Sequence, residues 1–498
     1  MKKISIILIA SAVFAVSCTK NASDELNQNP KSSSSGIGTA LFLYGEQSLV
    51  NTYNTTSVGI SPFRVISQEW NENSYEYESD YNLSYYNSPG NFWNNLYVNT
   101  IHNFELAKQS FPVGFLGTAG ELRNDLDITD MLEVYAYYML VATYGNIPYS
   151  QAENVDIPFP KFDDAKTVYT ELLTRLDTCM AGLDVTQGAM GSADQIYGGN
   201  TTEWMKFGAS LKLKMAMLNA TNDPTDAATE VNAAIGTGVF TSDADDALFT
   251  YDPASPSNSD PIWNAIEYSG RHDFGPGGLL VTTMNGWNDP RLPFYFSQFN
   301  GAYVGGVAGN PNNSFGSYSD FCCSATGSNL YSAGLPGDIL DYAEVEFYLA
   351  EAAAQGLITG GAAVAASHYD SAITSSINYW GNLSGATASQ LTPEIATYLA
   401  QPTVNYATAV AASSWQQVIG YQEFIANYNK NWDSWTDERR LGQPNINVVS
   451  PPQGAATSFP LRFTYPPNET TSNPTNTAAA VATLPGGVDA LTAALFWE

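Results

Sequence analysis

The segment from residue 67 to residue 87, SQEWNENSYEYESDYNLSYYN, gathers aromatic rings and carboxylates without the spacing of a helix. Ring faces can stack on a sugar or a peptide, while carboxylates and amides accept hydrogen bonds from the O–H and N–H groups of such ligands. The segment therefore predicts a ligand-binding surface with six candidate residues: Trp70, Tyr75, Tyr77, Tyr81, Tyr85 and Tyr86. The alternative is a structured loop whose tyrosines cover neighbouring helices. If the rings bind, Trp70→Ala or Tyr75→Ala should weaken ligand capture without unfolding the protein.

A second candidate lies at residues 300–323, NGAYVGGVAGNPNNSFGSYSDFCC. Its glycines would let backbone approach a ligand, and Tyr303, Phe315 and Tyr318 supply rings. The alternative is a mobile loop that contacts a partner protein.

Enzyme chemistry and metal binding find little support. His102, His272 and His368 stand apart from one another, and no H-E-x-x-H, G-x-S-x-G or Walker-type motif occurs. Asp243, Asp245 and Asp246 lack the ligand spacing of a calcium loop and predict a solvated acidic turn. We therefore expect a protein without catalytic activity, metal or cofactor. The alternative is a surface glycosidase or lyase that uses paired carboxylates, which are too common among 49 acidic residues to identify.

The N-terminus carries the signature of a secreted lipoprotein. Lys2 and Lys3 precede a mostly apolar run over residues 4–16 that is too short for a membrane-spanning helix of about 20 residues. Cys18 follows small residues in Ala15-Val16-Ser17-Cys18, where acylation of the thiol and cleavage before it would make Cys18 the new N-terminus. The alternative is ordinary cleavage near Ser17. We expect a signal peptide over residues 1–17, a flexible tether over 18–38 and a binding domain over 39–498.

Charge and cysteine content narrow the function further. The formal net charge is −30, which disfavours nucleic acid as a partner. Tyrosine and tryptophan are abundant, with 30 and 10 residues. Cys179 falls in a helical pattern and predicts a small buried side chain. The adjacent Cys322 and Cys323 could form a strained disulfide or remain as two thiols.

Helical periodicity dominates the elements that must position these residues. Apolar spacing and end signals predict helices at 39–53, 92–110, 127–144, 165–183, 203–220 and 339–357. The spacing Ala165, Tyr169, Leu172 recurs as Ala365, Tyr369, Ala372, which is typical of the second helix in a tetratricopeptide-like pair. We expect a mainly α fold, an irregular helical scaffold with long loops near 54–91, 252–335 and 444–490. Trp432 and Trp435, with Arg439 and Arg440, should join a C-terminal helix to this scaffold.

Several stretches along nearly the whole chain resemble the SusD/RagB-like outer-membrane lipoproteins, in particular the second SusD-like branch. These stretches are DELNQNP at 24–30, YGNIPYSQA at 144–152, DPRLPFYF at 289–296, LPGDILDYAEVEFYLAEAAAQG at 335–356, NWDSWTDERRLGQPNI at 431–446, RFTYPPNE at 462–469 and LPGGVDALTAALFW at 484–497.

The resemblance implies a helical scaffold with tetratricopeptide-like units and ligand-facing loops. It also implies a lipid-anchored outer-membrane protein, exposed at the cell surface, that acts as the hinged lid of a SusC-like TonB-dependent transporter. Such a protein captures oligosaccharides, or in some branches oligopeptides, and is not an enzyme. Asp24 and Glu25, after the lipidated cysteine, would then support export to the surface.

Overall fold

The computed structural model describes residues 37–310, 313, 316–321, 323–324, 327–328, 332–446 and 458–498. The predicted lipidation at Cys18 and the state of the Cys322–Cys323 pair lie outside the described side chains. None of the helices in these ranges combines the length and apolar character that a membrane crossing needs.

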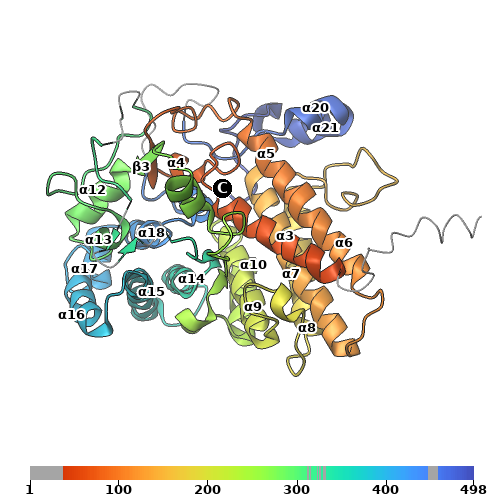
Figure 1. Cartoon of the computed structure of the whole chain (residues 1–498), viewed down its shortest axis with the longest axis horizontal. Helices are drawn as coiled ribbons and strands as arrows, with labels where there is room; N and C mark the ends of the chain where they lie inside the picture. Colours follow the sequence, from red (N-terminus) through yellow and green to blue (C-terminus); the bar gives the residue numbers. More distant parts are fainter. Residues whose placement is uncertain are drawn as a thin grey trace, which may run out of the picture.

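Helices of the N-terminal half lie side by side on one side of the molecule (Figure 1). They are α3 (Ile37–Asn54), α5 (Ser88–Asn94), the π-helix η1 (Asn95–Ile101), α6 (His102–Ser110), α7 (Ala119–Tyr144), α8 (Ala165–Gly182), α9 (Thr201–Leu218) and α10 (Pro224–Thr237). Each predicted helix in this half is present. The α7 helix begins eight residues earlier than expected because Thr118 and Glu121 form a capping box that satisfies both backbone N–H groups.

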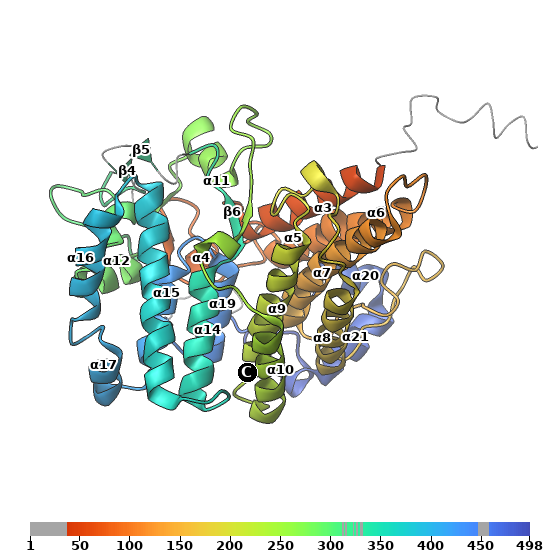
Figure 2. The same cartoon turned by 90° about the horizontal axis from the view of Figure 1, so that it is seen from below.

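The C-terminal half forms a second group of helices. These are α12 (Gly278–Gly286), α13 (Leu292–Tyr295), α14 (Tyr342–Gln355), α15 (Gly361–Leu383), α16 (Ala388–Leu399), α17 (Tyr406–Ala412), α18 (Trp415–Ala426) and α19 (Asn431–Leu441). Figure 2 shows α14 and α15 running beside α9 and α10. The mainly α fold is confirmed.

Both predicted helix pairs are present, with α7 packed on α8 and α14 packed on α15. Tyr169 and Tyr369, the recurring aromatic residues, are buried. The Tyr169 hydroxyl donates to the Met215 carbonyl oxygen at 2.7 Å, which also ties α8 to α9. The recurring pattern therefore marks the inner face of the second helix in each pair.

The segments expected as long loops contain short elements. They are α4 (Phe63–Ile66), α11 (Pro261–Trp263), the π-helix η4 (Asn264–Tyr268), α20 (Pro467–Ser472), α21 (Pro474–Thr483) and η5 (Pro485–Gly487), together with α12 and α13. Two further short helical turns, η2 (Gly191–Ala193) and η3 (Asp243–Asp245), lie outside these predicted loops. Two short antiparallel strand pairs join distant parts of the chain: β1 (Trp70–Glu72) with β3 (Phe274–Pro276), and β2 (Ala247–Phe249) with β6 (Gly337–Leu340). A third pair is local and joins β4 (Cys323–Ser324) with β5 (Gly327–Ser328).

Buried ion pairs connect the two halves. The Lys214 ammonium on α9 lies 2.9 Å from Glu344 on α14 and 2.7 Å from Asp433 on α19. Arg440 on α19 contacts Glu351 on α14 at 2.5 Å. The side chains of Trp432 and Trp435 are fully buried, so α19 joins the scaffold through both packing and charge, as predicted. Because an unpaired buried charge is costly, these contacts fix how the helices meet.

Buried apolar side chains gather in three clusters within the described residues. The first core cluster lies among the N-terminal helices and reaches α14 and α19. The second core cluster surrounds β1, β3, α12 and α13, and the third lies among α14 to α18. Cys179, 2% exposed, belongs to the first cluster, as predicted. The second cluster carries the segment in which the sequence predicts a binding surface.

Candidate functional site

The pairing of β1 with β3 positions the aromatic segment 67–87. Trp70 lies opposite Pro276, and Glu72 lies opposite Phe274. The pairing brings β3, about 200 residues away in sequence, to the edge of the aromatic segment. The π-helix η4 ends a few residues before β3 and lies on the same stretch of chain.

Three of the predicted ligand-stacking rings point into the protein. Trp70 is 1% exposed, with its ring centroid 4.4 Å from that of Phe321 and 4.7 Å from the Arg64 guanidinium carbon. Tyr81 is also buried. Tyr318 is 8% exposed, and its hydroxyl accepts a hydrogen bond from Asn71 Nδ2 at 3.2 Å. These rings pack in the core and offer no open face, which corrects the sequence-based assignment of all three to ligand stacking.

The other tyrosines of the segment are here called the tyrosine cluster: the exposed Tyr75, Tyr85 and Tyr86 and the half-buried Tyr77. The rings of Tyr77 and Tyr85 stack with centroids 3.7 Å apart and planes 12° apart. Tyr86 meets Tyr85 edge to face at 4.7 Å. Tyr75 is 61% exposed and Tyr85 is 55% exposed. The sequence-predicted site is therefore split, and its solvent-facing half is a compact aromatic surface.

A pocket of about 220 Å³, here called the tyrosine pocket, opens beside this cluster. Tyr75 and Tyr86 form part of its wall, and the remaining lining comes from three separate segments: Ser57, Val58, Gly59, Glu72, Ser74, Arg271, Asp273 and Phe274. The Arg271 guanidinium pairs with the Asp273 carboxylate at 2.6 Å. The sequence-based prediction missed Arg271 and Asp273, because only the β1–β3 pairing places them next to the tyrosines.

Buried carboxyl groups lie beneath the pocket. Glu72 and Glu78 are 2% and 0% exposed, and the backbone N–H of Ser79 donates to Glu72 Oε2 at 2.9 Å. Burial raises the pKa of Glu78 to about 7, and burial together with the neighbouring Glu78 charge raises the pKa of Glu72 well above its usual range. Both side chains therefore favour the protonated form more than a solvent-exposed glutamate would. The pocket floor consequently carries less negative charge than its composition suggests.

Hydrogen bonding also sets the state of the cluster itself. The hydrogen bond between the Tyr77 and Tyr85 side chains is the largest cause that raises the pKa of Tyr77 to about 12, and the charge of Tyr85 is the second. The Tyr77 hydroxyl is therefore neutral at physiological pH and can donate or accept a hydrogen bond. Tyr303, the remaining candidate, is half-buried, packs against the second core cluster and is not among the residues that line the tyrosine pocket.

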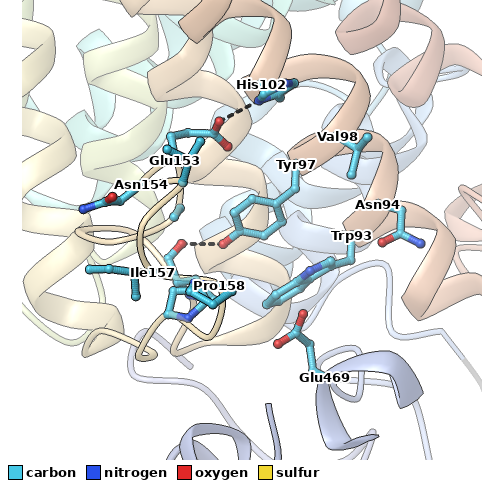
Figure 3. Close-up of a pocket in the computed structure, with 14 residues that line it drawn as sticks. Trp93, Asn94, Tyr97, Val98, His102, Glu153, Asn154, Ile157, Pro158 and Glu469 are labelled. Carbon is cyan, nitrogen blue, oxygen red and sulfur yellow. Dashed lines mark hydrogen bonds and ion pairs between the residues drawn. The ribbon is translucent and has the colours of Figure 1, made fainter. Parts of the chain in front are cut away.

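A second cleft of about 490 Å³ lies between η1 and the loop at residues 148–160 (Figure 3). The Tyr97 hydroxyl donates to the Pro148 carbonyl oxygen at 2.5 Å, and His102 Nδ1 lies 2.8 Å from Glu153 Oε2. Glu469, from α20, closes one side, and burial raises its pKa. The cleft forms where the expected helix 92–110 passes through a π-helical turn, and such turns often occur at functional positions.

The two concave sites differ in how their rings are used. In the larger cleft the side chain of Trp93 is only 5% exposed, as expected of a core residue, and the hydroxyl of Tyr97 is already engaged. In the tyrosine pocket the lining rings of Tyr75 and Tyr86 are 61% and 41% exposed, and Tyr85 beside them in the tyrosine cluster is 55% exposed. Because a stacking platform needs an open ring face, the tyrosine pocket is the better candidate site.

The acidic turn takes part in structural contacts. Lys206 contacts Asp245, and Ser375 donates to Asp243. Within the described ranges, no group of three or more His, Cys, Asp or Glu residues is arranged to hold a metal ion.

The model of the SusD-like family described as "Starch-binding associating with outer membrane" matches residues 30–466. No curated protein sequence matches the chain. Solved structures share its fold. One described as a chitin-binding protein has 22% identity and a TM-score of 0.78, covering 93% of this chain and 99% of the other. A SusD homologue from Bacteroides uniformis has 24% identity and a TM-score of 0.75, covering 93% and 99%. A chitin-binding SusD homologue from Flavobacterium johnsoniae has 22% identity and a TM-score of 0.74, covering 92% and 98%.

Proposed function

Because the chain belongs to the SusD-like family, described as starch-binding and associated with the outer membrane, we propose that it captures a nutrient oligosaccharide at the tyrosine pocket. The observation that carries this proposal is the exposed tyrosine cluster beside a pocket with hydrogen-bonding groups. The apolar face of a sugar ring would stack on Tyr75 or Tyr85, while Arg271 and Asp273 would hydrogen bond to its hydroxyl groups.

A neutral glycan suits this pocket better than a basic oligopeptide, the alternative ligand. A basic peptide would draw its affinity from carboxylates, but Glu72 and Glu78 are buried, and burial favours their protonated forms. The half-buried Asp273 is already paired with Arg271. The description of two proteins of the same fold as chitin-binding supports a glycan as well.

The sequence also predicts how the protein is anchored and which partner it serves. We propose that acylation at Cys18 anchors the protein to the outer membrane, at the cell surface, and that it acts as the lid of a SusC-like TonB-dependent transporter. In this role the protein binds its ligand and releases it unchanged to the transporter, without cleaving it.

The binding site is tested by isothermal titration calorimetry with maltoheptaose and chitohexaose, on the wild type, Tyr85→Ala and Tyr44→Ala. Tyr44 is a matched control because it is also half exposed but lies on α3, outside the tyrosine pocket. We expect Tyr85→Ala to lose about 1–3 kcal/mol of binding free energy, the range for an anchoring aromatic residue, and Tyr44→Ala to bind like the wild type. Equal affinities in all three proteins would place the site elsewhere. Release of reducing ends during the titration would instead indicate a glycosidase.

The lid and the anchor are tested together by capturing the native lipoprotein from outer membranes. Mass spectrometry should identify a TonB-dependent barrel as the partner and an acylated residue 18. An unmodified Cys18 without a barrel would contradict the lid role and leave the glycan site to be judged by calorimetry alone.

A further inference from the structure

A cleft of about 510 Å³ lies among α12, α17 and α18, on a different set of elements from the tyrosine pocket. Figure 1 shows where these three helices lie. No charged side chain occurs among its lining residues: Thr282, Thr283, Gly286, Trp287, Pro402, Thr403, Ala409, Ala412, Ser413, Gln417, Val418 and Tyr421. We refer to it as the uncharged cleft. In a chain with a net charge of −30, this wall presents a site without formal charge.

Two aromatic rings are held in place at this wall. Trp287 follows the last residue of α12, and its ring centroid lies 5.5 Å from that of Tyr421 on α18, with the planes 55° apart. Trp287 packs against both the second and the third core clusters but stays partly exposed. The rings are therefore rigid before any ligand arrives, which lowers the entropy that binding must overcome.

Neutral hydrogen-bonding groups complete the wall. Thr282, Thr283 and Thr403 contribute hydroxyl groups. The Ser413 hydroxyl donates to Gln417 Oε1, so the Gln417 amide oxygen is engaged and its nitrogen can donate to a ligand. Aromatic faces combined with hydroxyl and amide groups match the apolar faces and hydroxyl groups of a sugar ring.

The missing charge selects among ligand classes. A carboxylated or phosphorylated ligand would lose hydration here without gaining a cation, and a basic ligand would gain no carboxylate. We infer that the uncharged cleft is a second saccharide site, which binds one or more units of a neutral glycan. This inference rests on the proposed function for its ligand class but uses none of the residues of the tyrosine pocket.

Gly286 offers a variant that blocks the cleft without disturbing the core. It is the last residue of α12, it lines the cleft, and a Cβ atom placed there meets no atom within 4 Å. Gly286→Leu would therefore extend into the space that the sugar would occupy. Gly236→Leu is the matched control, because Gly236 is also helical and equally open but lies on α10.

The test is the number of glycan sites, measured by calorimetry with maltoheptaose and chitohexaose on the folded chain. We expect two sites in the wild type and in Gly236→Leu. We expect one detectable site in Gly286→Leu, because the uncharged cleft loses at least tenfold in affinity. In Tyr85→Ala we expect an unchanged site at the uncharged cleft and a tyrosine-pocket site weakened about 5- to 150-fold, the range that corresponds to 1–3 kcal/mol. Thermal unfolding of each variant checks that the fold is intact.

Each other outcome overturns a defined part of this account. Two sites in Gly286→Leu, or a single site in the wild type that Tyr85→Ala removes, would overturn the second site and leave the proposed function standing. A single wild-type site that only Gly286→Leu removes would support the cleft and contradict the tyrosine pocket. If Gly286→Leu keeps both sugar sites but loses capture of the outer-membrane barrel, the cleft is a protein-docking surface instead. A wild type that binds neither sugar would overturn both proposals.

Discussion

The buried (inner) and solvent-facing (outer) halves of segment 67–87 both carry aromatic residues but have different surroundings. On the inner side, Trp70 and Tyr81 are buried together with the carboxyl groups of Glu69, Glu72 and Glu78. On the outer side, the tyrosine cluster faces solvent beside a pocket. Aromatic and acidic residues in one short stretch therefore serve the core and the proposed binding surface at the same time.

The β1–β3 pairing separates the two halves. It fixes Trp70 beneath Phe274 and Phe321, and it brings Arg271 and Asp273 to the outer side. Tyr75 adopts a positive φ of 64°, which turns the chain sharply after β1. Aromatic content alone thus locates the segment proposed to bind a ligand but does not say which rings face solvent.

The largest effect expected is on stability, from the inner half. Trp70→Ala should lower the free energy of unfolding by about 3–5 kcal/mol, because a large buried ring leaves a cavity that the core fills only in part. Urea unfolding measures this difference. Tyr85→Ala, in the exposed half, should change it by less than about 0.5 kcal/mol. Equal losses in both variants would remove the distinction between the halves. The loss expected for Trp70→Ala differs from the expectation, from sequence alone, that this variant spares the fold.

The pH dependence of stability should also come from the inner half. Burial raises the pKa of Glu69 from 4.5 to about 7, against the opposing effects of hydrogen bonds and of the nearby Arg64. The unfolded chain loses this proton near pH 4.5, whereas the folded chain keeps it until about pH 7, so folding loses stability as the pH rises through this window. The loss attributable to Glu69 is on the order of 3 kcal/mol.

Glu69→Gln should abolish that part of the decline, since glutamine keeps an acceptor for the Asn429 N–H but does not ionise. Unfolding free energies at pH 5 and pH 8 measure the change. Glu394→Gln, at an exposed position on α16, is the control and should follow the wild-type curve. A Glu69→Gln curve parallel to that of the wild type would show that this carboxyl group is ionised in the folded protein.

The smallest effect expected is on affinity, within the outer half. Tyr77→Phe keeps the ring that stacks on Tyr85 at 3.7 Å but removes the hydroxyl group. Sugar binding should weaken by about 0.5–1.5 kcal/mol, the net value of one hydrogen bond, with no change in stability. Calorimetry with the glycan that the wild type binds measures this difference. A loss as large as that of Tyr85→Ala would mean that the hydroxyl, rather than the ring stack, dominates recognition.

Local patterns predicted most of the helical scaffold. Apolar spacing identified the helices that became α3, α7, α8, α9 and α14. In the structure Asp164 caps α8 by accepting a hydrogen bond from the backbone N–H of Thr167. Local patterns did not reveal the π-helical turn at residues 95–101 or the short helices within the expected loops. Those depend on packing partners that lie far away in sequence.

The sequence by itself determined the helix pairs, the acidic charge, the absence of recognisable catalytic motifs and the segment in which binding residues would lie. These properties follow from residue types and short-range spacing, which each stretch of chain carries alone. Only the tertiary structure decided that Tyr75 and Tyr85 face solvent while Trp70 and Tyr318 do not, and that Arg271 joins them. It also brought Trp287 and Tyr421, 134 positions apart by their numbers, to one uncharged wall. Burial and proximity are set by contacts between distant segments, and no local pattern records them.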